Sequence, residues 1–384
     1  MSPAPATGPG AVDVVVIGGG IAGVSAAFEL VATGRSVVLL EREPQLAHHT
    51  TGRSAAVFLE SYGPPPVRAL SKASRPLFAA AADTLGVEDA LTPRQSLWLA
   101  PSGQEAQLQR MLDELPGLER LTPEAAGRVC PVIRVDGFVD AALEPDAANI
   151  DVLGLHQGYV RTGRAQGLVI DHSWPVIAIR RAAGGRGFTV EAAGGTSISC
   201  GSVVLAAGAW CDELGMFAGA RPLGLRPLRR TIAICPTSAE LDPAGPMVGD
   251  AAHSYYWKPE GPNVLCSPAD ETPSPPCDAR PEEEDVALGI ERVNESTTLA
   301  LRSVRTAWAG LRTFTGDGVP AIGEDAEIPG LWWVAGQGGY GIQTAPAAAV
   351  LLAALFDGDG TTVPASLAAA GVSASALSPR RFAS

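Results

Sequence analysis

Residues 14–23 read VVVIGGGIAG and decide the fold class. An apolar, β-branched run leads into three glycines with G-x-G-x-x-G spacing, Gly18, Gly20 and Gly23, and a helical pattern follows. Gly18 permits a tight turn, Gly20 lets the backbone approach a pyrophosphate, and Gly23 lets the helix pack closely on the strand. The spacing therefore predicts a dinucleotide-binding β-α-β unit whose helix N-terminus, at Ile21 and Ala22, offers N–H groups to phosphates.

Three later stretches extend this unit. Residues 36–41 form a second apolar strand that ends in Glu41, where an acidic side chain can bind ribose hydroxyls. Residues 202–210, SVVLAAGAW, and residues 331–344, LWWVAGQGGYGIQT, each lead a strand into small residues. A domain that binds NAD alone does not need a further strand and glycine loop this late in the chain, so the pattern favours FAD. The last helix would face the flavin pyrimidine edge with its positive dipole end.

The composition sets the class of protein. A length of 384 residues suits about two domains, and a net charge of −13 argues against general binding to nucleic acid. The six cysteines show no C-x-x-C pair, which indicates a reduced, cytoplasmic protein without a structural metal. Residues 1–10 lack the basic and apolar regions of a signal peptide, and we expect a flexible tail. The apolar stretch 345–356 is too short to span a membrane as a helix.

Short motifs along nearly the whole chain then become informative. They are HHTTGRSAA (48–56), YG (62–63), VRAL (67–70), HQGY (156–159), AAGAWCD (206–212), RPLGL (221–225), WAGLR (308–312), QGGYGIQT (337–344) and LSPRR (377–381). In these motifs and their order the chain resembles the superfamily of D-amino-acid oxidase, glycine oxidase and sarcosine oxidase. Within it, the chain is most similar to the bacterial FAD-dependent D-arginine dehydrogenase type.

The resemblance implies an α/β fold in which a Rossmann-type FAD-binding domain is interleaved with an α+β substrate domain built on an antiparallel sheet. We expect the FAD domain over 11–62, 146–212 and 306–375, and the substrate domain over 63–145 and 213–305. Residues 376–384 would form a C-terminal tail.

The expected cofactor contacts surround the glycine loops. Thr50, Arg53 and Ser54 supply donors, and Ala55 and Ala56 permit close approach. The full set of cofactor candidates is Gly18, Gly20, Ile21, Ala22, Gly23, Glu41, Arg42, Thr50, Thr51, Arg53, Ser54, Ala55, Ala56, Val176, Ala207, Gly208, Trp210, Gly310, Gly338, Gly339, Tyr340, Gly341, Ile342 and Gln343. FAD would be held without a covalent bond, because residues 313–322 lack the cysteine that relatives with covalent flavin use.

Arginine and tyrosine are the candidates for binding a substrate carboxylate. Arg312 can bind a carboxylate through two parallel hydrogen bonds, which is the role that the resemblance implies. Strand alternation sends Arg229 and Arg230 to opposite faces, and the residues alone do not say which faces the flavin. The resemblance implies that Arg229 does, that Tyr256 closes on the carboxylate and that Tyr62 covers the site.

Two residues of the last glycine loop complete the set of catalytic candidates. The carbonyl of Gly339 could accept the substrate amine, and Gln343 could hydrogen-bond substrate or flavin.

The pocket for the substrate side chain departs from the arginine-oxidising relatives. Ser96 replaces their glutamate, and Val57 and Leu59 replace a histidine and a threonine. Uncharged side chains should be favoured, because a buried cation needs a counter-charge. Glu60 lies nearby in the sequence, but its direction is not fixed by the pattern.

These observations predict FAD-dependent oxidation of a D-amino acid by hydride transfer from Cα to flavin N5. The product is an imino acid, which water converts into a 2-oxo acid and ammonia. The electron acceptor is not identified. An N-methyl amino acid or a 2-hydroxy acid is an alternative substrate, and a flavin-binding sensor without activity is an alternative class. A sensor has no use for a carboxylate clamp formed by Arg312 and Tyr256.

Overall fold

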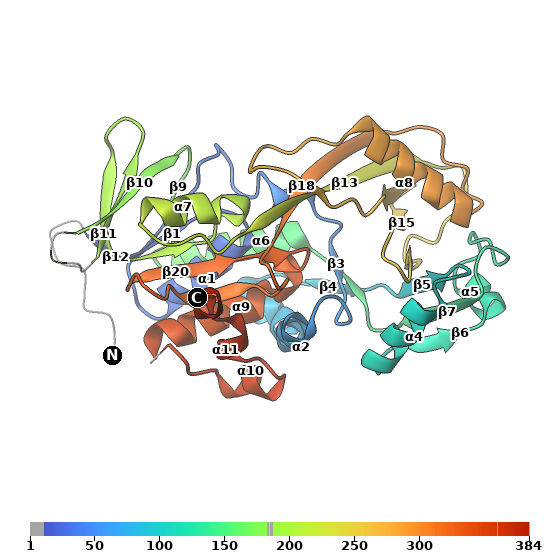
Figure 1. Ribbon diagram of the computed structural model, residues 1–384, viewed down its shortest axis with the longest axis horizontal. Helices are drawn as coiled ribbons and strands as arrows, with labels where there is room; N and C mark the ends of the chain where they lie inside the picture. Colours follow the sequence, from blue (N-terminus) through green and yellow to red (C-terminus); the bar gives the residue numbers. More distant parts are fainter. Residues whose placement is uncertain (1–10, 183, 185–186, 359, 384) are drawn as a thin grey trace.

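The computed structural model describes residues 11–182, 184, 187–358 and 360–383, which form two sheet-based parts side by side (Figure 1). Over these residues the first sheet has eight strands in the order β10-β11-β12-β1-β2-β9, with β20 beside β12 and β19 beside β20. Its strands are β1 (Val12–Ile17), β2 (Val37–Leu40), β9 (Val169–Asp171), β10 (Val176–Arg181), β11 (Phe188–Ala192), β12 (Ser197–Leu205), β19 (Ala321–Glu324) and β20 (Leu331–Ala335). β9, β2, β1, β12 and β20 run parallel.

Both faces of this sheet are covered, as the unbroken apolar run of β1 predicts. Val14 and Val16 face a core shared with helices α1 (Ile21–Ala32), α2 (Pro65–Ala79), α6 (Val152–Ala165) and α9 (Gly341–Asp357). Val15 and Ile17 face the opposite core, which includes α7 (Cys211–Phe217). The carboxyl end of β1 therefore enters the glycine loop from a rigid, fully packed layer.

The second sheet is mainly antiparallel and has ten described strands in the order β21-β18-β13-β16-β15-β14-β5-β7-β6, with β17 beside β13. They are β5 (Ser96–Ala100), β6 (Glu119–Leu121), β7 (Asp140–Glu144), β13 (Arg226–Pro236), β14 (Met247–Asp250), β15 (Tyr256–Glu260), β16 (Asn263–Ser267), β17 (Thr272–Pro273), β18 (Thr306–Phe314) and β21 (Gln337–Gly338). Helices α5 (Pro123–Val129) and α8 (Glu283–Ser296) pack on one face. The other face carries an apolar cluster that includes Leu59, Trp98 and Tyr256.

The remaining elements are short. Strands β3 (Val57–Phe58), β8 (Ala148–Ile150) and β4 (Leu91–Pro93) form a small sheet. The short helices are α3 (Ala81–Leu85), α4 (Glu105–Glu114), α10 (Ala365–Ala369), α11 (Ala374–Leu377), η1 (Thr50–Arg53), η2 (Gly208–Trp210) and η3 (Pro379–Phe382). None of the helices in the described part of the chain is both long and apolar enough to cross a bilayer.

The α/β class is confirmed, but the sheets divide the chain differently from the expected boundaries. β18 pairs with β13 along its whole length, so residues 306–314 belong to the second sheet rather than to the cofactor domain. α2 packs against α9 in the first core, although residues 63–145 were assigned to the substrate domain. The expected C-terminal tail contains η3, and Arg381 there pairs with Asp317. The expected tail at residues 1–10 lies outside the described residues.

Candidate active site

A cavity of about 1020 Å³ runs from the carboxyl end of β1 to the apolar face of the second sheet. Every cofactor candidate named from the sequence lines it, except Gly23. Arg312, Tyr256, Tyr62, Gly339, Gln343, Val57 and Leu59 line the same cavity, whereas Arg229 and Ser96 do not. The site is therefore continuous from the glycine loop to the candidate carboxylate clamp.

The glycine loop needs its glycines for close backbone contacts. Gly18 has a φ of +116°, and a Cβ there would lie 2.5 Å from the Ala206 carbonyl oxygen. A Cβ on Gly23 would lie 1.8 Å from the Gly18 carbonyl oxygen. Gly23 thus acts by letting α1 pack under the loop, which explains why it does not reach the cavity.

Two buried side chains fix the shape of this loop. Glu41 accepts hydrogen bonds from the backbone N–H of Gly19 at 2.7 Å and of Glu43 at 2.9 Å. His156, on α6, lies with Nε2 2.9 Å from the Gly19 carbonyl oxygen, and its burial lowers its pKa. A neutral His156 can donate that hydrogen bond. The loop, the α1 N-terminus and the Glu41 carboxylate form a cradle that fits the phosphates and a ribose of FAD.

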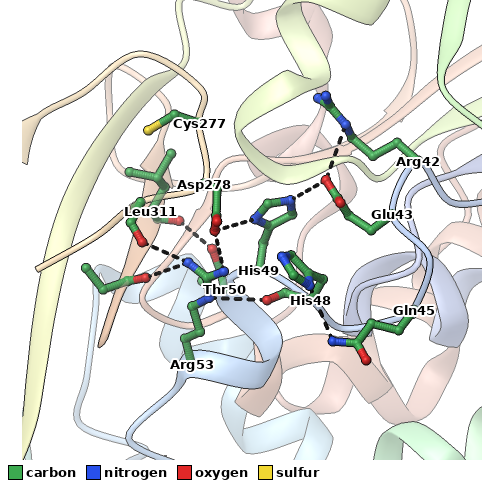
Figure 2. Close-up of polar contacts among 12 residues, drawn as sticks. Arg42, Glu43, Gln45, His48, His49, Thr50, Arg53, Cys277, Asp278 and Leu311 are labelled. Carbon is green, nitrogen blue, oxygen red and sulfur yellow. Dashed lines mark hydrogen bonds and ion pairs between the residues drawn. The ribbon is translucent and has the colours of Figure 1, made fainter. Parts of the chain in front are cut away.

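The loop over residues 48–53 is fastened to the second sheet (Figure 2). Arg53 donates to the carbonyl oxygens of Ala279 at 2.9 Å and Ala309 at 3.0 Å, and to Asp278 at 2.5 Å. Thr50 donates to the Leu311 carbonyl oxygen at 2.9 Å. The guanidinium of Arg53 and the hydroxyl of Thr50 thus bind protein atoms, although the sequence suggested them as cofactor donors. Their role in the structure is to position the loop along the cavity.

Two more polar contacts hold the same loop. Thr51 accepts a hydrogen bond from the backbone N–H of Ile21 at 3.0 Å, which joins the loop to the start of α1. His49 lies between two carboxylates, with Nε2 3.0 Å from Glu43 and Nδ1 3.9 Å from Asp278 (Figure 2). Glu43, His48 and His49 have ligand-type atoms within 4.8 Å of one another.

Arg312 is the central cation of the substrate end. It lies on β18 and donates from Nη1 to the Tyr62 hydroxyl at 3.0 Å, and no described carboxylate pairs with it. Burial lowers the pKa of Arg312, but Tyr62, Tyr256 and Glu271 raise it by more, so the net pKa lies above its usual value. The guanidinium is thus charged and available to an anionic ligand.

Tyr256 supplies an unsatisfied group beside this cation. Its side chain lines the cavity and is 9% exposed, and its hydroxyl has no hydrogen-bond partner among the described residues. A buried polar group without a partner costs stability, which a bound ligand can restore. Arg312 and Tyr256 together fit a carboxylate.

The expectation for Arg229 was wrong. Arg229 pairs with Glu282 at 2.6 Å and with Asp285 at 2.9 Å, both at the acidic start of α8 on the far face of the sheet. Arg230 faces the cavity, donating to Glu271 at 3.0 Å and to the Asp270 carbonyl oxygen at 2.7 Å. The carboxylates at the start of α8 pair with Arg229 and thereby stabilise the arrangement in which Arg230 faces the cavity.

Gln343 differs from its expected role as well. Its Nε2 donates to the Leu59 carbonyl oxygen at 3.0 Å and to the Ser71 hydroxyl at 2.7 Å, while Oε1 accepts from the Leu59 N–H at 3.2 Å. Both of its N–H groups are therefore used within the protein. Gly339 lies against Arg312, since a Cβ there would be 3.0 Å from Nη1.

The end of the cavity near Leu59 is apolar. Val57 and Leu59 line it, together with residues that sequence reasoning missed: Trp98, Ile232, Met247 and His253. Ser96 is completely buried behind this wall, and Trp98, two residues further along β5, reaches the cavity in its place. Alternation along β5 could have found Trp98. Glu60 pairs with Arg75 on α2 and does not line the cavity.

Comparisons with known proteins agree with this geometry. Residues 13–355 match the family described as FAD dependent oxidoreductase. The chain is 25% identical to glycine oxidase from Geobacillus kaustophilus, covering 90% of this chain and 93% of that protein. It is 28% identical to 4-methylaminobutanoate oxidase (formaldehyde-forming) from Paenarthrobacter nicotinovorans, covering 87% of this chain and 42% of that protein.

Solved structures extend the likeness to the fold. The structure of L-proline dehydrogenase from P. horikoshii superimposes with a TM-score of 0.84 at 21% identity, covering 98% of both chains. The structure of the Geobacillus kaustophilus glycine oxidase gives a TM-score of 0.79 at 22% identity, covering 91% of this chain and 95% of that chain. With the nearly complete family match and the cradle around Gly18 and Glu41, this chain belongs to the FAD dependent oxidoreductase family and binds FAD.

Proposed function

We propose that this protein oxidises the Cα–N bond of a D-amino acid with FAD as the electron acceptor of the first half-reaction. One observation carries the proposal: a charged arginine without a carboxylate partner, Arg312, lies beside the unsatisfied hydroxyl of Tyr256 in the cofactor cavity. An amino acid presents the carboxylate that both groups lack. This protein would resemble the D-arginine dehydrogenase type in reaction, with a changed side-chain pocket.

The residues that hold FAD follow from the cradle. The glycine loop from Gly18 to Ala22 and the Glu41 carboxylate would hold its pyrophosphate and a ribose, with residues 206–210 on the same side of the cavity. We propose that no covalent bond is formed. When bound, FAD accepts a hydride at N5. The N-terminus of α9, beginning at Gly341, lines the cavity and favours the negative charge that follows reduction.

The chain's own residues orient the substrate. Arg312 and Tyr256 bind the carboxylate, and Tyr62 covers them, so that Cα is presented at one fixed distance and angle. The charge of Arg230 is balanced by Glu271, which leaves Arg312 as the cation for the carboxylate. The Gly339 carbonyl accepts an amine N–H. Loss of the hydride from Cα and of a proton from nitrogen gives the imino acid, which water hydrolyses.

The apolar wall sets the preferred side chain. Val57, Leu59, Trp98, Ile232 and Met247 offer no charge, and the carboxylate of Glu60 is paired with Arg75 outside the cavity. A cationic side chain would lose its hydration at a cost of several kcal/mol without a counter-charge. An apolar side chain gains about 25 cal/mol for each Å² that it buries. We therefore propose a preference for uncharged, apolar D-amino acids over D-arginine and D-lysine.

Two alternatives use the same clamp. Two relatives of this chain, a 4-methylaminobutanoate oxidase and a dimethylglycine dehydrogenase, favour an N-methylated amino acid as the second candidate. A 2-hydroxy acid would also present a carboxylate to Arg312. A sensor without activity is disfavoured, because it gives the Arg312 and Tyr256 pair nothing to bind.

The setting of the reaction is also proposed. All six cysteines are free and five of them are buried, which suits a cytoplasmic protein in a reducing compartment. Electrons would leave the reduced flavin to an external acceptor.

Anaerobic bleaching of the flavin tests the proposal. The holoenzyme is mixed with D-leucine, D-phenylalanine, D-arginine, their L-enantiomers, sarcosine, N,N-dimethylglycine and a 2-hydroxy acid. Fast bleaching by D-leucine and D-phenylalanine, with slower bleaching by D-arginine, is the expected result. Bleaching by the L-enantiomers or by sarcosine alone would overturn the D-specific proposal, and no bleaching by any carboxylate substrate would overturn the amino-acid proposal itself.

A further inference from the structure

Residues 59–63 lie between β3 and α2, and we call them the lid segment. Each residue from Leu59 to Tyr62 is held by a side chain from another part of the protein. Leu59 is held through both backbone groups by Gln343, and Glu60 is paired with Arg75. Ser61 is bound by Glu144, and Tyr62 is bound by Arg312. The first two contacts come from helices of the first core, and the last two come from strands of the second sheet. The lid segment therefore crosses from one part of the molecule to the other above the carboxylate clamp.

Glu144 is an unusual residue for its position. It is the last residue of β7, it is 6% exposed, and it does not line the cavity. Both of its oxygens accept from Ser61: the Ser61 N–H donates to Oε1 at 3.2 Å and the Ser61 hydroxyl donates to Oε2 at 2.5 Å. Burial raises the pKa of Glu144 and the nearby Glu60 carboxylate raises it further, while the hydrogen bonds from Ser61 and the nearby Trp98 side chain lower it by less. A buried carboxyl group is costly, so a residue kept there is expected to do more than fill space.

Tyr62, the neighbour of Ser61, is the residue that the contact between Ser61 and Glu144 could position. Tyr62 touches Arg312 through its hydroxyl, and its ring lies 5.1 Å from the Tyr340 ring in an edge-on arrangement. A substrate carboxylate would compete for the Arg312 donor that now binds Tyr62. The contact at Tyr62 therefore changes when substrate binds, whereas the contact at Ser61 can stay. Fixing Ser61 keeps the Tyr62 hydroxyl above the clamp in both states.

We propose that Glu144 is a positioning residue that holds Ser61 and thereby keeps Tyr62 over the substrate carboxylate. The inference rests on the proposed function, because it gives Arg312 and Tyr62 the carboxylate as ligand. Glu144 touches neither substrate nor FAD. Its removal should weaken the binding of carboxylates while leaving the hydride-transfer step of the fully occupied enzyme nearly unchanged.

Benzoate is a suitable probe, because it carries a carboxylate, cannot be oxidised at a Cα and perturbs flavin absorption when it binds near the ring. Titration of the holoenzymes of wild type, Glu144→Gln, Glu144→Ala and Ser61→Ala should give dissociation constants that rise about tenfold in Glu144→Ala, which loses a charge-assisted contact. Glu144→Gln retains one acceptor and should recover part of the affinity. Adding Ser61→Ala to Glu144→Ala should raise the dissociation constant little further, since both changes break the same contact.

Steady-state kinetics separate positioning from general damage. Using the best substrate found by bleaching, KM should rise with the benzoate dissociation constant in Glu144→Ala, while kcat stays within about twofold. Glu60→Gln is the matched control, because it weakens a contact of the same segment on the first core and should leave both constants within about twofold. Equal losses in kcat and kcat/KM for Glu144→Gln and Glu60→Gln would overturn the inference and assign Glu144 to stability alone.

Further measurements apply if a variant does not fold or if benzoate does not bind, and hydrogen exchange is the main one. If Glu144→Ala does not fold, Glu144→Gln and Ser61→Ala carry the same comparison. If benzoate does not bind the wild type, the proposed carboxylate clamp fails, and the exchange of amides 59–63 in the holoenzyme still tests the contact. Faster exchange of Ser61 and Tyr62 in Glu144→Gln, with α9 unchanged, supports the inference, and unchanged exchange overturns it.

Discussion

The two ends of the cofactor cavity are built from different parts of the chain. At the glycine loop the surface is backbone: Gly18, Gly20 and the start of α1 define it, and Glu41 and His156 hold its shape. At the substrate end the surface is made of side chains on antiparallel strands, such as Arg312, Tyr256 and Trp98. The shape of the backbone surface depends on the positions where a side chain would collide and glycine is needed. The side-chain surface depends on which face of each strand is turned towards the cavity.

The largest effect should come from adding one methyl group to the backbone end. In Gly23→Ala the new Cβ would lie 1.8 Å from the Gly18 carbonyl oxygen, so α1 must move away from the loop. We expect a loss of about 3 kcal/mol in stability and loss of bound FAD, because the cradle is deformed. The ratio of flavin to protein absorbance and the melting temperature measure both. Gly117→Ala is the control, since a Cβ there meets nothing within 4 Å, and equal damage in both variants would contradict the explanation.

At the substrate end, Arg312→Met and Arg229→Met should differ sharply. Arg312→Met removes the cation of the clamp and should cost about 2–5 kcal/mol in kcat/KM while FAD stays bound. Arg229→Met removes ion pairs with Glu282 and Asp285 on the face of the sheet away from the cavity and should change kcat/KM by less than about threefold. Anaerobic flavin reduction by stopped flow compares them. A large loss in Arg229→Met would mean that Arg229, and not only Arg312, binds the substrate carboxylate.

The rate of reaction with oxygen tests whether a lysine lies between the two ends of the cavity. No lysine lines the cavity over the described part of the chain, and residues 263–269 contain none. Lys258 is buried and pairs with Glu260 at 2.9 Å. Without an ammonium beside the flavin to stabilise negative charge on oxygen, we expect turnover with an artificial acceptor to exceed turnover with oxygen by at least about tenfold. Equal rates in a coupled peroxide assay and a dye assay would make the protein an oxidase.

The smallest effect should come from a region remote from both ends. Burial raises the pKa of Asp317, but hydrogen bonds from Arg381, Val319 and Thr315 lower it by more, to about 2. The charged carboxylate thus contributes stability above its unfolded pKa of 3.8 that is lost as the pH falls towards 2. Asp317→Asn should lower Tm by about 1–2 °C at pH 7. The difference from wild type should shrink below pH 4 in calorimetric scans, and a difference that grows there would contradict this account.

The contrast between the ends also explains what the sequence could predict. The spacing of Gly18, Gly20 and Gly23 located the cofactor end, because positions without room for a side chain must be glycine and can be recognised in the sequence. Alternation separated Arg229 from Arg230 but could not choose between them, since the choice depends on α8, which starts more than 50 residues later.

The other differences have the same origin in tertiary contacts. The sequence motif predicts Ser96 in the pocket and does not point to Trp98, because neighbouring strands decide how deeply each residue of β5 is buried. Gln343 was expected at the ligand, but Leu59 and Ser71, far away in the sequence, occupy its amide. β18 was assigned to the cofactor part, although its hydrogen bonds along β13 place it in the second sheet.

The position of β18 has a thermodynamic consequence. The strand carries Arg312, which lines the cavity, and its backbone at Ala309 and Leu311 accepts the Arg53 and Thr50 hydrogen bonds from the loop over residues 48–53. Because that loop also lines the cofactor cavity, we expect occupancy at one end to change the binding free energy at the other. Linkage makes this effect reciprocal: the factor by which FAD strengthens carboxylate binding is the factor by which a carboxylate strengthens retention of FAD. We therefore expect an amino acid that binds at Arg312 to slow the loss of FAD from the protein.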